Sequence, residues 1–182
     1  LCTSRGTGLW KAFAYAVDFI LRGVMHMATS TFHPARLQGA AAVPPAKSEA
    51  HRALLLAALG REPCQLNGFP LPLCDDTQAM INGVTALGAT VTPENNTLLV
   101  VPGTEISAVQ ETAVCEVHAC AAALRMLIPA FLVLGRPVRF TMEDALFPRP
   151  LTAFDPLMNA IGATFTRTPS AAGRRASVEV SG

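Results

Sequence analysis

Charged side chains are scarce in this sequence: Asp, Glu, Lys and Arg make up 15% of the 182 residues, against about 25% in a typical soluble domain. Fourteen Lys and Arg against thirteen Asp and Glu leave a formal net charge of +1. This balance gives no electrostatic case for nucleic acid or an anionic membrane as a partner. The hydrophobic fraction of 51% excludes a disordered tail, because disordered chains combine few apolar residues with strong net charge.

The sequence also lacks a hydrophobic run long enough to cross a membrane. Its most apolar stretch, residues 119–135, contains Arg125 and Pro129, whereas a spanning helix requires about 18 apolar residues. We therefore expect no membrane partner.

Paired cysteines are missing as well. Five cysteines are an odd number, and none has Cys-x-x-Cys spacing, which favours reduced thiols over a disulfide framework. Cys115, His118 and Cys120 lie close together in the sequence, but a second cluster of metal ligands is lacking. We therefore interpret these three as core or strand residues and predict no metal.

Residues 1–26 differ in character from the rest of the chain. The first residue is Leu1, and we take Met27 as the first credible start. A signal peptide is one interpretation, but Asp18 interrupts its apolar region and no clean cleavage site follows. We favour a non-native or upstream leader over residues 1–26, followed by a domain over residues 27–182.

The chain repeats itself after residue 35. Ala86–Thr92 (Ala-Leu-Gly-Ala-Thr-Val-Thr) and Ala160–Thr166 (Ala-Ile-Gly-Ala-Thr-Phe-Thr) are nearly the same sequence, 74 positions apart. Arg52 and Arg125, each followed by an apolar segment ending in glycine, are 73 positions apart. This nearly constant offset predicts a duplicated supersecondary unit.

Each unit, about residues 36–106 and 107–182, is expected to contain a strand, a helix, a strand, a helix and two strands. In the first unit, Ser48 is expected to cap a helix that runs to about Leu59. Asp76 or Thr77 opens the second helix, and a hairpin turning at residues 93–96 follows.

In the second unit, the corresponding helices are expected at about Cys120–Leu134 and Leu151–Ile161. Mixed sheets covered by helices suit such units, so the predicted fold class is α/β (α+β) with repeated βαβαββ units.

One helix start carries the side chains that suggest chemistry. Lys47 and Ser48 stand at its N-terminus, and Arg52 lies one turn later on the same face as Ser48. Free N–H groups and basic side chains at a helix N-terminus favour an anion such as phosphate. The alternative is a solvated helix start, which the nearby Glu49 favours.

Four motifs occur in order along the chain. Lys47–Leu59 reads Lys-Ser-x-x-His-Arg-Ala-Leu-Leu-Leu-Ala-Ala-Leu, and Asp75–Met80 reads Asp-Asp-Thr-x-x-Met, followed by Ala-Leu-Gly-Ala at residues 86–89. Leu124–Pro129 reads Leu-Arg-x-Leu-Ile-Pro, and Leu146–Leu151 reads Leu-x-x-Arg-Pro-Leu. Together they resemble the signatures of EPSP synthases, the 3-phosphoshikimate 1-carboxyvinyltransferases of the shikimate pathway.

The resemblance implies six βαβαββ units in two domains, of which about two are present here. It also implies a transferase that moves the enolpyruvyl group of phosphoenolpyruvate to shikimate 3-phosphate without a cofactor. By the motifs, Lys47 would bind phosphoenolpyruvate, Ser48 and Arg52 would bind shikimate 3-phosphate, and Arg149 would be a second contact to phosphoenolpyruvate. A cytoplasmic location follows from the same resemblance.

The sequence departs from the family pattern at the candidate phosphoenolpyruvate loop, Ala121 and Ala122. A glycine of the family corresponds to Ala121, whose methyl group would crowd the ligand. We find no convincing catalytic acid or base: Glu143 and Asp144 are expected in a turn and match no catalytic motif. We therefore expect an N-terminal part that is inactive without the missing C-terminal units.

Two alternatives remain. The chain could be a degenerate, non-catalytic fragment, or a module of the same fold that associates with another chain. The sister family, UDP-N-acetylglucosamine enolpyruvyl transferase, fits less well. It typically has Lys-Asn in place of Lys47-Ser48, and a reactive cysteine where this chain has Asp144.

Overall fold

The computed structural model describes residues 31, 38–39, 43, 45–103 and 111–182. Ala42–Gly182 form one compact unit, distinct from Leu1–Ala41, and the description below concerns this unit alone. The leader expected at residues 1–26 lies outside the described residues, so it stays a prediction.

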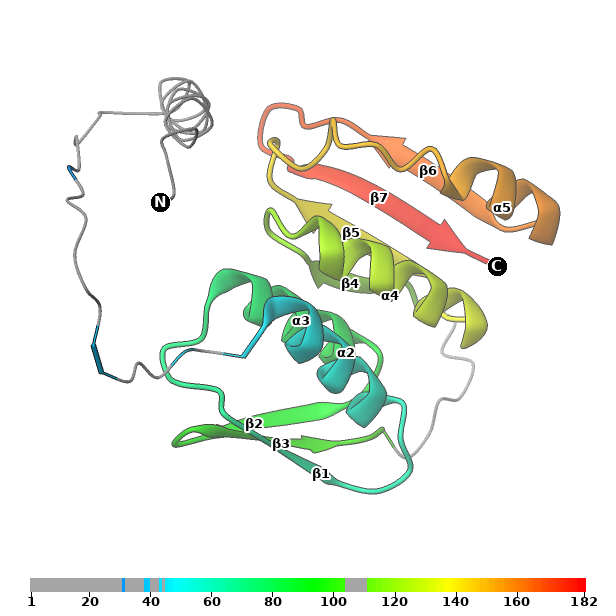
Figure 1. The fold of residues 1–182 in the computed structure, drawn as a ribbon. Helices are drawn as coiled ribbons and strands as arrows, with labels where there is room; N and C mark the ends of the chain where they lie inside the picture. The colour runs from blue at the N-terminus through cyan, green and yellow to red at the C-terminus, as the bar shows by residue number, and fades with distance from the viewer. Residues whose placement is uncertain (1–30, 32–37, 40–42, 44, 104–110) are drawn as a thin grey trace, which may run out of the picture. The chain divides into compact units, whose positions relative to one another are not determined.

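Two helices cover one face of a three-stranded antiparallel sheet in the first half of this unit (Figure 1). The strands pair in the order β1-β3-β2. The elements are α2 (Lys47–Ala58), β1 (Cys64–Asn67), α3 (Asp75–Ala86), β2 (Thr90–Glu94) and β3 (Thr97–Val101). The expected hairpin is present, and Asn95 at its tip has a φ of 53°, a conformation that Asn tolerates better than most residues.

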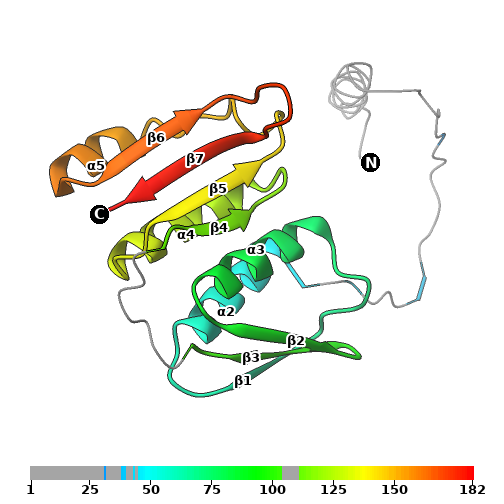
Figure 2. The ribbon, with the colours of Figure 1, turned by 180° about the vertical axis from the view of Figure 1, so that it is seen from behind.

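A four-stranded mixed sheet forms the second half, with strands in the order β4-β5-β7-β6. Its elements are β4 (Ala113–Glu116), α4 (Ala121–Val133), β5 (Val138–Met142), α5 (Phe154–Ile161), β6 (Thr164–Thr168) and β7 (Ala176–Ser181). β4 and β5 are parallel, with α4 as the crossover between them, and the other neighbours are antiparallel. The view from behind shows α4 on the far side of this sheet (Figure 2).

The duplication is visible in the backbone. α2 begins at Lys47 and α4 at Ala121, and β1 begins at Cys64 and β5 at Val138; in each pair the second residue lies 74 positions after the first. The order β1-β3-β2 in the first sheet matches β5-β7-β6 in the second. The α/β fold of repeated units expected from the sequence is therefore confirmed.

The core lies between each sheet and its helices. β7 shows how the sequence makes it: Val178 and Val180 are buried, and they pair with Phe140 and Val138 of β5. Phe140 in turn packs edge-on against Phe131 of α4, with ring centroids 5.5 Å apart. Apolar side chains from both partners thus meet on one face of the second sheet.

Side-chain hydrogen bonds to backbone oxygens connect the two described halves. Asn82 Nδ2 in α3 donates to the backbone oxygen of Glu116, at the end of β4, over 3.0 Å. Arg136 Nη1 donates to the backbone oxygen of Leu87, at the end of α3, over 2.9 Å. A cation at a helix C-terminus is favourable because the last carbonyl groups carry partial negative charge.

Three expected helix starts are wrong. α3 begins at Asp75 with Cys74 as its N-cap, rather than at Asp76 or Thr77. Ser48 is not the cap of α2: the N-cap is Ala46, whose carbonyl already accepts from Glu49 N and Ala50 N, so Ser48 lies inside the first turn. α5 begins at Phe154 rather than Leu151. Leu151 is buried and its carbonyl accepts from Phe154 N, so the chain makes a separate turn before the helix.

Cys115 and Cys120 are buried, and the four cysteines of the described part are unpaired. No three His, Cys, Asp or Glu side chains of the described residues are grouped so as to hold a metal ion. Among the described helices, none is both long and apolar enough to cross a membrane.

Candidate functional site

The starts of α2, α3 and α4 meet at one place. Lys47, the first residue of α2, forms an ion pair with Asp76, the second residue of α3, with Nζ and Oδ2 2.6 Å apart. The N-cap of α4 is Cys120, whose sulfur accepts from Ala123 N over 3.4 Å. Cys120 also interacts with the Asp76 carboxylate. Three helix N-termini therefore surround one carboxylate and one ammonium group.

Each partner in this pair changes the proton affinity of the other. The hydrogen bond to Asp76 raises the pKa of Lys47, so the ammonium stays charged. Partial burial raises the pKa of Asp76, but the Cys120 thiol and the Lys47 ammonium lower it by more, and the net shift is downward. Both side chains remain about one-third to one-half exposed, so Lys47 can exchange Asp76 for a ligand at small cost.

A cavity of about 360 Å³ opens beside the pair. Its lining combines carboxylates, thiols and one imidazole: Cys74, Asp75, Asp76, His118, Ala119, Cys120 and Glu143. His118 has a φ of 48°, and its Nδ1 lies 3.5 Å from Glu116 Oε1. Three carboxylates therefore line the cavity. One of them, Asp76, is the ion-pair partner of Lys47.

Ser48 and Arg52 lie on the exposed side of α2, one helical turn apart. The opposite side is buried and includes Ala50, His51 and Leu54. Neither Ser48 nor Arg52 makes a side-chain hydrogen bond or ion pair with another described residue. Lys47, Ser48 and Arg52 all lie within the first two turns of α2.

Arg149 lies in an exposed turn. No described backbone hydrogen bond joins this turn to α2. The turn itself is anchored: Arg149 N donates to the backbone oxygen of Leu146, and Leu146 is 3% exposed. Arg125 Nη2 of α4 donates to the backbone oxygen of Pro150 over 3.0 Å. The guanidinium of Arg167 lies 4.9 Å from the ring centre of Phe147. The backbone on both sides of Arg149 is therefore held in place.

Ala121 and Ala122 do not form a loop, contrary to the sequence-based expectation. They are the first two residues of α4, and Ala121 is 7% exposed. The helix starts here because Cys120 is extended and caps the first turn. N–H groups in a first helical turn lack acceptors within their own helix, so this turn can still face an anion.

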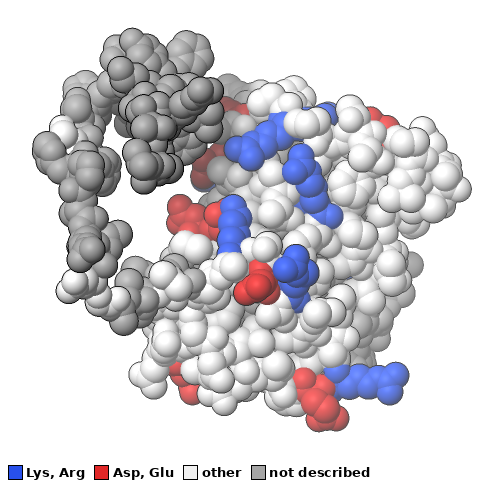
Figure 3. All heavy atoms as spheres, in the orientation of Figure 1, with Lys and Arg blue, Asp and Glu red and all other residues white. Residues whose placement is uncertain are grey.

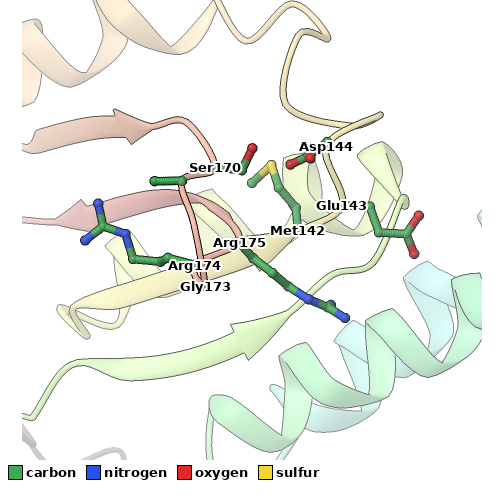
Figure 4. A pocket seen from close by; sticks show the side chains of 8 residues that line it. Met142, Glu143, Asp144, Ser170, Gly173, Arg174 and Arg175 are labelled. Carbon is green, nitrogen blue, oxygen red and sulfur yellow. The ribbon is translucent and has the colours of Figure 1, made fainter.

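A second, more open cavity of about 530 Å³ lies at the end of β5 and the β6–β7 hairpin (Figure 4). Arg174 and Arg175 extend from it in opposite directions, while Glu143 and Asp144 contribute carboxylates. Arg175 pairs with Glu116. Mixed charge is typical of this molecule: on the face in Figure 3, basic and acidic side chains are few and often adjacent.

Sequence reasoning missed the partners of Lys47. Sequence patterns place Asp76 only in a helix motif and Cys120 only among core or strand residues, as they do for His118, which lines the neighbouring cavity. One signal for the contact with Lys47 is present in the sequence: two consecutive acidic residues, Asp75 and Asp76, at a helix start. Carboxylates at this position interact favourably with the helix dipole and can also attract a nearby cation.

Comparison with known proteins decides the family. The model of the family "EPSP synthase (3-phosphoshikimate 1-carboxyvinyltransferase)" matches residues 32–173. The chain belongs to the EPSP synthase family. The 3-phosphoshikimate 1-carboxyvinyltransferase of Clostridium kluyveri is 28% identical over 124 residues, which are 68% of this chain and 28% of that protein.

Other members of the EPSP synthase family give the same picture. The enzyme of the same name from Clostridium beijerinckii is 27% identical over 145 residues, covering 77% of this chain and 33% of that protein. The structure of EPSP synthase from Acinetobacter baumannii superimposes with a TM-score of 0.62 at 20% identity, over 79% of this chain and 32% of that one. The chain therefore spans about a third of the length of these relatives.

Proposed function

We propose that this chain is the N-terminal part of a 3-phosphoshikimate 1-carboxyvinyltransferase and that it contributes part of the substrate site. Lys47 binds phosphoenolpyruvate, Ser48 and Arg52 bind shikimate 3-phosphate, and Arg149 is a second contact to phosphoenolpyruvate. The complete enzyme transfers the enolpyruvyl group to the 5-hydroxyl of shikimate 3-phosphate and releases phosphate, without a metal or organic cofactor.

The proposal rests on the arrangement of three side chains in the first two turns of α2, in a chain that belongs to this family. Ser48 and Arg52 project from its exposed side, and Lys47 stands at its first position with an ionic partner that a ligand can replace. A phosphate group at a helix N-terminus gains from the free N–H groups there. Each charge-assisted hydrogen bond adds about 1.5–3 kcal/mol.

We also propose that the chain by itself does not complete the reaction. Enolpyruvyl transfer needs an acid to protonate the methylene carbon of phosphoenolpyruvate and a base for the attacking hydroxyl. The nearby carboxylates Glu143 and Asp144 are exposed and follow β5, and they match no catalytic motif. The remaining repeat units of the enzyme are therefore the expected partner.

An association module of the same fold is the second candidate. Apolar side chains are exposed on three helices: Leu56 is 71%, Val133 85% and Ile161 56% exposed. An association module would use exposed apolar side chains of this kind as its contact surface. The sister activity on UDP-N-acetylglucosamine is less favoured, because Ser48 and Asp144 replace the asparagine and cysteine expected there.

The proposal is tested by titrating the isotope-labelled chain with shikimate 3-phosphate and following backbone amide signals. We expect the largest shifts at residues 47–52. A titration whose shifts cluster instead in the β1-β3-β2 sheet, or that moves no signal up to millimolar ligand, contradicts the proposal and favours the association module. A phosphate-release assay on the chain alone should read background.

A further inference from the structure

His51 is a fully buried imidazole that no role described so far uses. It is 0% exposed and lies one helical turn after Lys47, so both residues are on neighbouring positions of one side of α2. Its Nε2 atom is 3.0 Å from the backbone oxygen of Asp76, the residue whose carboxylate pairs with Lys47.

The chemistry of this contact fixes the state of the ring. A carbonyl oxygen can only accept, so Nε2 carries the hydrogen and donates it. In a neutral imidazole, Nδ1 is then an unprotonated acceptor. His51 Nδ1 is buried and has no hydrogen-bond partner among the described residues. A proton at Nδ1 would therefore be buried without an acceptor.

Asp76 is consequently held at two points. His51 binds its backbone, and Lys47 binds its carboxylate. We infer that His51 is a positioning residue: as a neutral donor, it ties the first turn of α3 to α2 and thereby places Asp76 against Lys47.

The charges around His51 agree with this role. Burial lowers the pKa of His51 and the Lys47 ammonium acts in the same direction, while the hydrogen bond to the Asp76 backbone oxygen and the Asp76 carboxylate act against them; the net shift is downward. On the α4 side, Cys120 faces the same carboxylate. A charged His51 would be buried beside the Lys47 ammonium, and both the burial and the repulsion between the two cations favour the neutral ring.

Two replacements separate the hydrogen bond from the burial. In His51→Gln the side-chain amide can donate to the same carbonyl, whereas His51→Leu fills the space and cannot donate. Thr77→Val is the matched control, because Thr77 Oγ1 bonds Cys74 Sγ over 3.2 Å in the same turn of α3 and makes no described hydrogen bond to His51.

The measurement is the NMR titration of the Asp76 carboxyl group in the full chain, together with the nitrogen signals of the His51 ring. We expect a neutral ring protonated at Nε2. We also expect the pKa of Asp76 to move toward its ordinary value in His51→Leu, to be restored in His51→Gln and to stay unchanged in Thr77→Val. Equal titrations in the Leu and Gln variants, or a ring protonated at Nδ1, would overturn the inference.

Ligand binding is a separate readout, which rests on the proposed function. If His51 positions Lys47 for its ligand, phosphoenolpyruvate affinity falls about two- to tenfold in His51→Leu, the range expected for one hydrogen bond, and recovers in His51→Gln. An Asp76 titration that responds as expected in a chain that binds no phosphoenolpyruvate contradicts the proposed function and leaves the positioning role intact. Unchanged titration with intact binding contradicts the positioning role alone.

Discussion

Gly83 in α3 lies directly against Leu127 in α4: a Cβ atom at Gly83 would be 2.1 Å from Leu127 Cδ1 and 2.6 Å from Cδ2. Leu127 is fully buried, so its side chain has little room to move. This close approach explains a glycine inside a helix, where it is otherwise unfavourable. The two repeat units therefore pack through a position where a side chain is absent.

Replacing Gly83 tests this packing. Gly83→Ala gains about 1 kcal/mol in helix propensity but overpacks the contact with Leu127, which costs about 1–3 kcal/mol. We expect a net loss in the free energy of unfolding by urea. The double variant Gly83→Ala with Leu127→Ala should lose less than the sum of the single variants. A more stable Gly83→Ala protein would show that the helices separate easily.

Arg136 provides the polar counterpart of this contact. Arg136→Met keeps most of the side-chain volume but removes the hydrogen bond to the carbonyl of Leu87. We expect a loss of about 1–2 kcal/mol in the free energy of unfolding. Arg139→Met is the control, because Arg139 pairs with Glu179 on an exposed face and should cost less than about 1 kcal/mol. Equal losses would contradict a linking role for Arg136.

His51 makes stability depend on pH in a defined direction. Burial lowers its pKa in the folded chain below the ordinary value of 6.5, so the unfolded chain binds the proton more readily. The stability that neutral His51 contributes is therefore present above pH 6.5 and is lost as the pH falls below it. We expect the stability difference between wild type and His51→Gln to shrink on acidification, measured by urea unfolding at several pH values. A difference that grows instead would show that His51 is bound in its charged form.

Ala121 is expected to limit phosphoenolpyruvate binding. Ala121→Gly removes the methyl group that would crowd the ligand at the start of α4, and we expect tighter binding in the presence of shikimate 3-phosphate. Ala123→Gly, at a fully buried position of the same turn, serves as control and should lower stability without tightening binding. If both variants bind as the wild type does, Ala121 does not face the ligand.

The sequence was sufficient to predict the repeated elements because their signals are local. Glycine follows the end of α3 at Gly88 and of α5 at Gly162, both with positive φ, and the turn residues at 93–96 predict the hairpin that β3 completes. The predicted cap of α2, Ser48, lies two positions after the observed cap, Ala46. Serine is a good cap residue in general, and only the backbone geometry at Ala46 excludes it here.

The site was predictable only in part for a different reason. Lys47, Ser48 and Arg52 are near one another in sequence, so helical spacing brings them together. The contacts of Lys47 with Asp76 and of His51 with the Asp76 carbonyl join residues more than twenty positions apart. They depend on how α2 packs against α3, which no local pattern specifies.

The most direct test of the central claim is calorimetric titration of the chain with shikimate 3-phosphate, comparing wild type with Arg52→Ala. Removing a charge-assisted bond of about 1.5–3 kcal/mol should lower affinity by about 10- to 150-fold, while unfolding is unchanged because Arg52 is exposed. Arg61→Ala, at an exposed arginine just after α2, should bind as the wild type does. Equal affinity of wild type and Arg52→Ala would contradict the assignment of this helix start as the substrate site.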